Sequence, residues 1–448
     1  MPKRNLVLLC LLSLACLVAW AARRSVGAAR LYGEVTGHVR RAYIEPVGSD
    51  ALFHAAMEGV FARLDGQSGI VSVSDVGEAE GTTAGDFAGV GLELSIDGAE
   101  GVPLVTTPMV GSPAWLGGIA TGDRIVAIDG VRTSGMRLKE AVGALRGPAG
   151  SRVVVDVVGP AGQTPEIRDE RGDLVAARSV SLERAVVRQE TVLGDRRRAD
   201  GSWDWFVEGE EGVALVRLAR FDAATAAELD RACAEIAAVA APRGIVLDLR
   251  GNRGGSVAAA VEVCDRFLDD GVIVATRRRA GRTDAVESRR ATPGAVFSGV
   301  PMVVLVDGWT ASAAEIVAAC LQDRSRAVVA GTRSFGKGTV QTTVPLSDGR
   351  QALRLTTSEY LRPSLAPLHR HADAGDADPW GVSPDAGMEL APTGETLEAI
   401  RAWRAGRDSI PRHAAAVDAE GSAARLPRHV DPVLGRALVA IPASSAGR

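Results

Sequence analysis

The pattern of apolar and polar positions divides the chain into three regions. From residue 31 to about 75, apolar side chains recur at spacings of three and four residues, which predicts helices. From residue 87 to about 158, glycines bound short apolar runs, which predicts strands and one helix near Leu138–Leu145 in a compact, partly open barrel. From Val213 onward, strand patterns alternate with helix patterns. This alternation indicates βαβ units around a buried sheet.

The third region is regular enough to place each element. We expect strands at Val213–Leu218, Ile245–Leu249 and Val303–Val306, and helices near Ala224–Ala240, near Val257–Leu268 and from Ser312 onward. The polar stretch Arg188–Asp204 predicts a connection or a long hairpin outside the core. Beyond Arg404 the chain is rich in Arg, Ala and Pro and has no sustained period, apart from a short helix that Asp431-Pro432 should start and that should run through Leu438.

The first 22 residues predict export. An apolar run of 18 residues, Asn5–Ala22, follows Lys3 and Arg4, as in an export signal. Ala19-Trp20-Ala21 fits a cleavage site, but a run of this length can also just span a bilayer. Residues 1–22 are therefore either a signal peptide or a membrane anchor, and the protein is expected in the periplasm or the cell envelope.

Length and composition exclude some classes of function. A chain of 448 residues predicts two or three domains, and 46% hydrophobic residues indicate a globular protein. The net charge of −4 provides no basic surface for nucleic acid. The five cysteines form no zinc motif: Cys10 and Cys16 lie in the leader, and Cys233, Cys264 and Cys320 lie on apolar helix stripes, which favours buried thiols.

Lysine is scarce in this chain. Only three of the 51 basic side chains are lysines, Lys3, Lys139 and Lys337, and the other 48 are arginines. Arginine does not give up its proton, whereas a buried lysine can, so a retained lysine suggests a need for a free amine. None of the six histidines lies between His54 and His369, so most of the chain has no imidazole.

Ser312 stands where a helix should begin after the strand that ends at Val306. Ser312 and Glu315 match a capping box, and a serine at a helix start is usually a cap. The same position also offers free backbone N–H groups and the positive end of the helix dipole, which can hold an oxyanion beside the hydroxyl. Ser312 is therefore a candidate nucleophile as well as a candidate cap.

A nucleophilic serine needs a base. No histidine lies nearby in sequence, although spacing alone does not exclude His369. Lys337 is the better candidate, because it follows the apolar run 327–330 between flanking glycines and burial can keep its amine uncharged. The segment Gly331–Lys337 also matches most of a phosphate-binding loop, but Gly338 occupies the place where Ser or Thr must hold Mg²⁺. Nucleotide binding is therefore not expected.

Three blocks in one order resemble the carboxyl-terminal processing peptidases, which are serine proteases with a PDZ domain and a Ser-Lys active site. The blocks are Leu247-Asp248-Leu249-Arg250-Gly251-Asn252-Arg253-Gly254-Gly255, Thr310-Ala311-Ser312-Ala313-Ala314-Glu315-Ile316 and Phe335-Gly336-Lys337-Gly338-Thr339-Val340-Gln341. The first has Arg253 where proline is common, the second replaces both outer serines of Ser-Ala-Ser-Ala-Ser-Glu-Ile, and the third matches without change. The resemblance covers roughly residues 31–395.

This resemblance implies an α+β multidomain fold. It implies a helical N-terminal segment at 28–80, a PDZ domain at 84–185, a βαβ-rich catalytic domain like those of crotonases and Clp proteases at 186–395, and a C-terminal helix with an Arg/Ala/Pro-rich tail at 396–448. It also implies a serine endopeptidase that needs neither a metal nor an organic cofactor. The expected partners are protein or peptide substrates with accessible C-termini, and a homo-oligomer or an adaptor is left open.

The resemblance also implies roles for individual residues. Ser312 would be the nucleophile, Lys337 the general base, and Gln341 the residue that orients the lysine. The backbone N–H groups of Ala313 and of Gly254 or Gly255 would form the oxyanion hole. A substrate's terminal carboxylate would dock at the loop Gly89, Val90, Gly91 and Leu92. Backbone N–H groups of such a loop form an anion nest, and the adjacent strand edge can pair with an extended peptide.

Other segments are weaker signals. Leu64-Asp65-Gly66-Gln67-Ser68 departs from the family's usual Leu-Asp-Pro-His-Ser, while Thr356–Tyr360 and Gly381–Asp385 also resemble the family. One polar segment contains His369, His371, Asp373, Asp376 and Asp378. The irregular spacing of these residues favours a solvated polar insertion over a metal site. The competing class of function is a non-catalytic scaffold whose PDZ domain captures protein tails.

Overall fold

The computed structural model describes residues 27–442, apart from 74–85, 99, 160–166, 170–171, 173, 177, 281–282, 348 and 409–429. The predicted leader, with Cys10 and Cys16, lies outside the described residues, so its role in export stays a prediction. Within the described ranges, no helix is both long enough and apolar enough to cross a bilayer.

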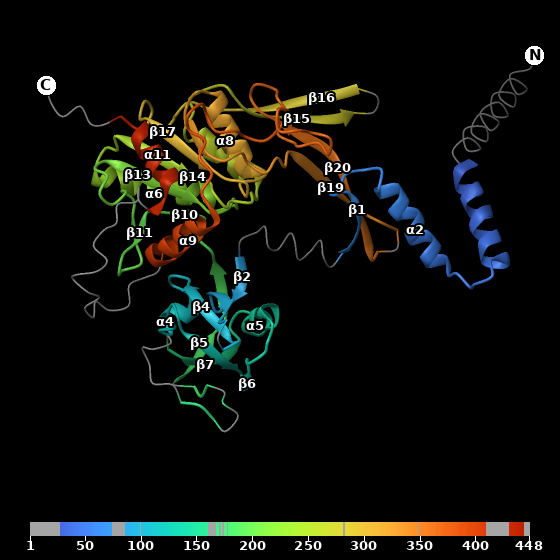
Figure 1. Cartoon of the computed structure of the whole chain (residues 1–448), viewed down its shortest axis with the longest axis horizontal. Helices are drawn as coiled ribbons and strands as arrows, with labels where there is room; N and C mark the ends of the chain where they lie inside the picture. The colour runs from blue at the N-terminus through green and yellow to red at the C-terminus, as the bar shows by residue number, and fades with distance from the viewer. Residues whose placement is uncertain are drawn as a thin grey trace, which may run out of the picture.

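A five-stranded sheet forms the centre of the C-terminal half (Figure 1). Its strands, in spatial order, are β10 (Val192–Leu193), β13 (Val213–Leu218), β14 (Gly244–Asp248), β17 (Met302–Val306) and β18 (Val328–Gly331). All are parallel except β10, which runs antiparallel to β13. β14 and β17 are buried along their whole length, as expected for continuous apolar runs in a parallel sheet. The predicted βαβ units are confirmed, with strand ends within one residue.

Helices cover both faces of this sheet. Three pack on one face: α6 (Thr225–Val239), α7 (Val257–Asp265) and α8 (Ala313–Asp323). The C-terminal helix α11 (Pro432–Ala440) packs on the other. Asp431 caps α11 by accepting a hydrogen bond from the backbone N–H of Leu434 at 3.0 Å, so this helix begins where predicted. A further helix, α9 (Gly394–Asp408), was not predicted as a separate element.

The N-terminal region joins a second sheet. This sheet contains β1 (Gly69–Ser72), β20 (Gln351–Leu361), β15 (Val272–Ala280) and β16 (Thr283–Arg290), and β19 (Thr339–Pro345) also pairs with β20. β1 follows the exposed helix α2 (Ser49–Phe61) and runs antiparallel to β20, with Gly69 opposite Arg354. In Figure 1, β1 lies beside β19 and β20. Residues before the PDZ domain therefore pair directly with the sheet that carries Gln341.

The middle region is the expected strand-rich module with one main helix. Its sheet has the order β3 (Leu92–Ile96), β4 (Pro103–Pro108), β5 (Arg124–Ile128), β7 (Arg152–Val158) and β8 (Arg178–Glu183), with β6 (Val131–Arg132) beside β5. It carries α4 (Pro113–Leu116) and α5 (Leu138–Leu145), and β2 (Asp86–Gly89) pairs with β9 (Ala185–Arg188). The β2–β9 pair brings the two ends of the module together, and β3 is left as an edge strand.

The segment Arg188–Asp204 corrects one prediction. It contains the expected hairpin, in which β11 (Arg196–Arg197) pairs with β12 (Trp203–Asp204). The expectation that it lies outside the core is wrong, because Trp203 is only 5% exposed and belongs to the main core. The guanidinium carbon of Arg197 lies 3.7 Å from the centre of the Trp203 ring, and Arg197 donates to the carbonyl of Gly201. Stacking on an aromatic ring lets a basic side chain enter the core, which a polarity pattern does not reveal.

The three described cysteines are buried free thiols, as expected. Burial, reinforced by the charge of Asp230, raises the pKa of Cys233 to about 12. Burial likewise raises the pKa of Cys264. Because the thiolate is the reactive form, Cys233 and Cys264 are not nucleophiles at neutral pH.

Helix α11 should stabilise the sheet through Leu434, whose side chain is 1% exposed. We expect Leu434→Ala to lower the free energy of unfolding by about 2–5 kcal/mol, because it removes buried methyl groups and leaves a cavity. Urea denaturation followed by tryptophan fluorescence measures this change. Val439→Ala, on an exposed position of the same helix, should change the stability by less than about 0.5 kcal/mol. Equal effects of the two substitutions would contradict this packing.

Candidate active site

Ser312 lies in a strained turn directly before α8. Its backbone has φ +57° and ψ −118°, a conformation that non-glycine residues rarely adopt. The two halves of a capping box face each other here, but only the Glu315 half is a hydrogen bond. The Ser312 hydroxyl makes no capping hydrogen bond to the helix. The hydroxyl is therefore not committed to the cap that the sequence pattern suggested.

Hydrogen bonds between two loops hold this turn. Oδ1 of Asp307, which follows β17, accepts hydrogen bonds from the backbone N–H groups of Gly251, Trp309 and Thr310 at 2.9–3.0 Å. The hydroxyl of Thr310 donates to the carbonyl of Leu249 at 2.9 Å. The loops after β14 and β17 are thus joined, as expected at the carboxyl ends of neighbouring parallel strands.

The glycine turn after β14 packs against Ser312. A Cβ on Gly254 would lie 2.9 Å from Cβ of Ser312 and 3.0 Å from the nitrogen of Ala313, and φ is +101°. Only glycine fits there without displacement. The N–H of Gly254 donates to Oδ1 of Asn252 at 2.8 Å. Among the described residues, the N–H groups of Ala313 and Gly255 have no hydrogen-bond partner.

Glu315 connects the serine to the lysine. Its carboxylate is fully buried and accepts four hydrogen bonds, from the backbone N–H of Ser312 (2.8 Å), the hydroxyl of Ser334 (2.6 Å) and the backbone N–H groups of Gly336 (2.6 Å) and Lys337 (2.8 Å). The same oxygen, Oε2, accepts from Ser312 and Lys337. The backbone nitrogens of Ser312 and Lys337 therefore lie within about 6 Å of each other, given ordinary hydrogen-bond geometry.

The electrostatics of Glu315 reflect opposing effects. Burial raises the pKa of its carboxyl group, whereas the hydrogen bonds from Ser334 and from the three backbone N–H groups act to lower it. An unpaired carboxylate at this depth would be very costly, so its stability depends on the donors that the two loops supply.

Lys337 is partly exposed, so the burial expected for its side chain is incomplete in this structure. Within the described part of the chain its amine forms no hydrogen bond or ion pair. Gln341 lies four residues later, in β19. The NH₂ group of Gln341 donates to the hydroxyls of Thr339 at 2.9 Å and Thr356 at 3.2 Å. Both residues thus lie on the segment that Glu315 anchors.

Close packing explains the glycine that breaks the phosphate-loop pattern. A Cβ on Gly338 would lie 2.5 Å from the backbone nitrogen of His369. Burial, followed by the charge of His371, lowers the pKa of His369. Its Nδ1 is buried and has no hydrogen-bond partner among the described residues. The backbone of His369, which spacing left open as a base, packs against the loop that carries Lys337.

Comparisons with known proteins agree with this geometry. Residues 212–388 match peptidase family S41, and residues 104–159 match a PDZ domain. The chain is 33% identical to a carboxy-terminal-processing protease of Bartonella bacilliformis, over 74% of this chain and 70% of that protein. It is 31% identical to a chloroplastic C-terminal processing peptidase of Tetradesmus obliquus, over 84% of this chain and 76% of that protein. The chain belongs to the carboxy-terminal processing protease family.

A solved structure, titled photosystem II D1 C-terminal processing protease, shares 30% identity over 79% of this chain and 86% of that chain, with a TM-score of 0.44. Membership of the carboxy-terminal processing proteases makes this protein a serine-type endopeptidase with a PDZ domain. The family matches and the helices and sheets described above confirm the expected α+β fold.

The predicted peptide-binding loop lines a groove of this protease's PDZ domain. A cavity of about 200 Å³ lies between the loop Gly89–Leu92 and helix α5, where Val142, Leu145 and Arg146 complete its wall. The adjacent strand β3 is the edge of its sheet. An open edge beside a groove is the arrangement that accepts an added peptide strand.

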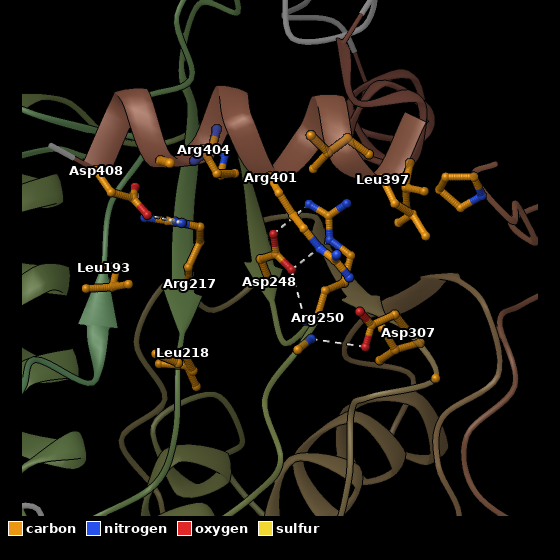
Figure 2. Close-up of a pocket in the computed structure, with 18 of the residues that line it drawn as sticks. Leu193, Arg217, Leu218, Asp248, Arg250, Asp307, Leu397, Arg401, Arg404 and Asp408 are labelled. Atoms are coloured by element: carbon orange, nitrogen blue, oxygen red, sulfur yellow. Dashed lines mark hydrogen bonds and ion pairs between the residues drawn. The ribbon is translucent and has the colours of Figure 1, made fainter. Parts of the chain in front are cut away.

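A larger cavity of about 610 Å³ lies elsewhere, at the carboxyl ends of β13, β14 and β17 (Figure 2). Helix α9 covers it, and the PDZ residues Glu93 and Thr107 also line it. Figure 2 shows two ion pairs on its walls, Arg217 with Asp408 and Asp248 with Arg250. Ser312, Lys337 and Gln341 do not line this cavity, so it is distinct from the predicted site.

Arg250 links the glycine turn of the protease to its C-terminal helix. Its guanidinium binds Asp248 and also Asp431, the fully buried cap of α11, at 2.7 and 2.8 Å. Burial acts to raise the pKa of Asp248, but the charge and hydrogen bonds of Arg250 outweigh burial and lower it. Asp248 therefore stabilises the fold above the acidic range, and this contribution is lost as the pH falls through its lowered pKa.

The polar loop 369–378 uses its backbone to bind an arginine. The carbonyls of Asp376 and Trp380 accept hydrogen bonds from Arg333, whose guanidinium lies 3.5 Å from the centre of the Trp380 ring. No group of metal-ligating side chains forms there among the described residues.

Sequence reasoning missed the role of Glu315 beyond a helix cap. The spacing Ser312-x-x-Glu315 was visible, but a capping box explains only one of its four hydrogen bonds. The other three come from residues 334–337, and no sequence pattern signals that these donors meet one carboxylate.

Glu315→Gln should slow the protease. The substitution replaces one carboxylate oxygen by an NH₂ group, which faces hydrogen-bond donors and finds no acceptor among them. A buried donor without an acceptor raises the free energy of the folded state by about 1–3 kcal/mol. We expect kcat on an unfolded protein substrate to fall about tenfold or more, with little change in KM. Glu262→Gln, at an exposed position of α7, is the matched control and should leave kcat unchanged. A wild-type kcat in the Glu315→Gln protein would show that catalysis does not need the hydrogen bonds of the Glu315 carboxylate.

Proposed function

We propose that this protein is an exported endopeptidase that cleaves peptide bonds with a Ser312–Lys337 dyad through an acyl-enzyme. The observation that carries this proposal is the shared hydrogen bonding of Ser312 and Lys337 to one oxygen of Glu315, which holds both backbones close together. The uncommitted hydroxyl and the unpaired amine are consistent with these roles.

In the proposed reaction, the uncharged amine of Lys337 removes the proton from the Ser312 hydroxyl as its oxygen attacks the substrate carbonyl. The N–H of Ala313 and an N–H of the Gly254–Gly255 turn stabilise the resulting oxyanion. The protonated lysine then gives its proton to the leaving amine, and the C–N bond breaks. Water, activated by the same lysine, hydrolyses the acyl-enzyme and restores both residues. Gln341 orients the lysine amine.

The strained backbone of Ser312 supports the role of nucleophile. A positive φ places a serine at a sharp turn between a strand and a helix, as in other nucleophile turns. Strain of this kind persists only where surrounding contacts hold it, and Asp307, Gly254 and Glu315 supply those contacts. A serine that acted only as a cap would not need such a conformation.

We further propose that the PDZ groove binds the C-terminal end of protein substrates. The support is the groove beside an edge strand, lined by the loop Gly89–Leu92. Export rests on the apolar leader pattern of residues 1–22. The site of action would then be the periplasm or the cell envelope, with the leader either cleaved or kept as an anchor.

The dyad predicts different effects for Lys139 and Lys337, the two lysines that follow residue 22. We expect Ser312→Ala and Lys337→Arg each to lower the rate of cleavage of a disordered protein by about a thousandfold or more, because arginine cannot give up its proton at neutral pH. Lys139→Arg, on the exposed surface of the PDZ domain, is the matched control and should keep the wild-type rate. Gel-based proteolysis assays measure these rates.

A serine-directed phosphonate separates the protease from the competing scaffold function. Labelling at Ser312 supports the dyad, and peptide binding without labelling supports a scaffold. Full activity of Lys337→Arg would refute lysine as the base.

The PDZ groove predicts dependence on a free carboxylate. Val142→Arg should fill the groove and weaken binding of a peptide with a free C-terminus about tenfold or more. Fluorescence anisotropy with the Ser312→Ala protein measures binding without cleavage. The Val131→Arg protein, which is changed at an exposed position of β6, should bind the peptide as tightly as the unchanged protein. If an amidated peptide binds as tightly as the free acid, the proposed recognition of the terminal carboxylate is contradicted.

A further inference from the structure

Two exposed aromatic rings lie in the loops that carry the proposed dyad. Trp309 precedes Ser312 by three residues and is 51% exposed, and Phe335 precedes Lys337 by two residues and is 54% exposed. After α2, these are the only exposed aromatic rings among the side chains that the structure describes. The backbone N–H of Phe335 donates to the carbonyl of Thr310 at 2.9 Å, which joins the two loops. An exposed ring beside a nucleophile can bind a substrate side chain.

Arg253 adds a positive charge to one of these rings. Its guanidinium carbon lies 4.5 Å from the centre of the Trp309 ring. Arg253 is exposed, and its guanidinium forms no hydrogen bond or ion pair with any other described residue. Stacking on the ring therefore holds the guanidinium while its N–H donors stay available.

Other stacked arginines of this chain have partners for their donors. Arg197 and Arg333 also lie on tryptophan rings, but both donate hydrogen bonds to nearby backbone carbonyls. Those hydrogen bonds give the two arginines a structural role. The described part of the chain supplies no such acceptor to Arg253, so its donors suit an acceptor that arrives with the substrate.

The backbone places Arg253 beside the nucleophile. On one side of it, the carbonyl of Asn252 accepts a hydrogen bond from the backbone N–H of Ala311 at 2.9 Å. On the other side, a Cβ on Gly254 would lie 2.9 Å from Cβ of Ser312. Because consecutive Cα atoms are about 3.8 Å apart, Cα of Arg253 lies within about 8 Å of that Cβ. An extended peptide advances about 3.3 Å per residue, so substrate side chains two or three residues from the cleaved bond can reach Arg253.

We propose that Arg253 and Trp309 form a subsite that binds a carboxylate of the substrate close to the cleaved bond. This inference rests on the proposed role of Ser312 as the nucleophile. The guanidinium offers two parallel N–H donors to a carboxylate, and the ring packs against the methylene groups that precede it. The protein should therefore prefer Asp or Glu at one position near the cleaved bond. A terminal carboxylate offers the same chemistry, so the two sources must be tested apart.

Peptides that differ at one position measure this preference. A quenched fluorescent peptide with a single cleaved bond carries Glu or Gln, in turn, at each of the three positions on either side of that bond. The initial rate at low peptide concentration gives kcat/KM. At one of these positions we expect the Glu peptide to be cleaved about three to ten times faster than the Gln peptide, as for a charge pair that the bound substrate partly shields from water. This ratio should fall as the salt concentration rises.

Substitutions in the subsite test the residues themselves. Arg253→Gln should lower the ratio of Glu to Gln cleavage to about one, and Arg253→Glu should make a Lys peptide a better substrate than the Glu peptide at the same position. Trp309→Leu removes the ring that holds the guanidinium and should also lower the ratio. Arg289→Gln, at an exposed position of β16, is the matched control and should keep the wild-type ratio. An unchanged ratio in Arg253→Gln would overturn the proposal.

A second pair of peptides separates the two sources of a carboxylate. If the subsite binds a terminal carboxylate, a peptide that ends three residues beyond the cleaved bond is cleaved faster as the free acid than as the amide, and Arg253→Gln removes this difference. If the wild-type protein prefers neither kind of carboxylate, the subsite is wrong while the Ser-Lys dyad stands. Cleavage by Ser312→Ala at the wild-type rate would instead refute the nucleophile, and the subsite beside it would fall as well.

Discussion

The catalytic region depends on one buried carboxylate. Glu315 sits in the first turn of α8 and accepts hydrogen bonds from both loops that carry the proposed dyad. A charge buried this deeply is stable only when its donors surround it, so neither loop can move away without leaving it unsatisfied. The strained turn at Ser312 and the placement of Lys337 are therefore two consequences of one interaction.

The parallel sheet supplies the frame for that interaction. The loops after β14 and β17 emerge at the same edge, where Asp307 joins them and Gly254 packs against Ser312. Arg250 then ties the first loop to Asp431 at the start of α11. The C-terminal helix, which lies far along the chain from the dyad, thus supports the turn beside the nucleophile.

Much of the fold was predictable from local patterns. The central strands β14 and β17 were recognisable because they are buried on both faces, and α6 because it is buried on one. The segment 188–204 was predicted as a connection or a long hairpin outside the core, because a polarity pattern does not show that Arg197 stacks on Trp203. Likewise, no periodicity shows that β1 pairs with β20, because that pairing joins segments that are remote in sequence.

Sequence alone determined the candidate chemistry, since Ser312, Lys337 and Gln341 stand in motifs whose residue types suit acyl transfer and a scarce lysine stands out among arginines. Only the tertiary structure decided what surrounds them: the four donors on Glu315, and the N–H of Ala313, which has no hydrogen-bond partner among the described residues. The reason is physical. Residue type limits which protons and lone pairs a side chain can offer, but hydrogen bonds act only over about 3 Å, and folding alone brings distant segments that close.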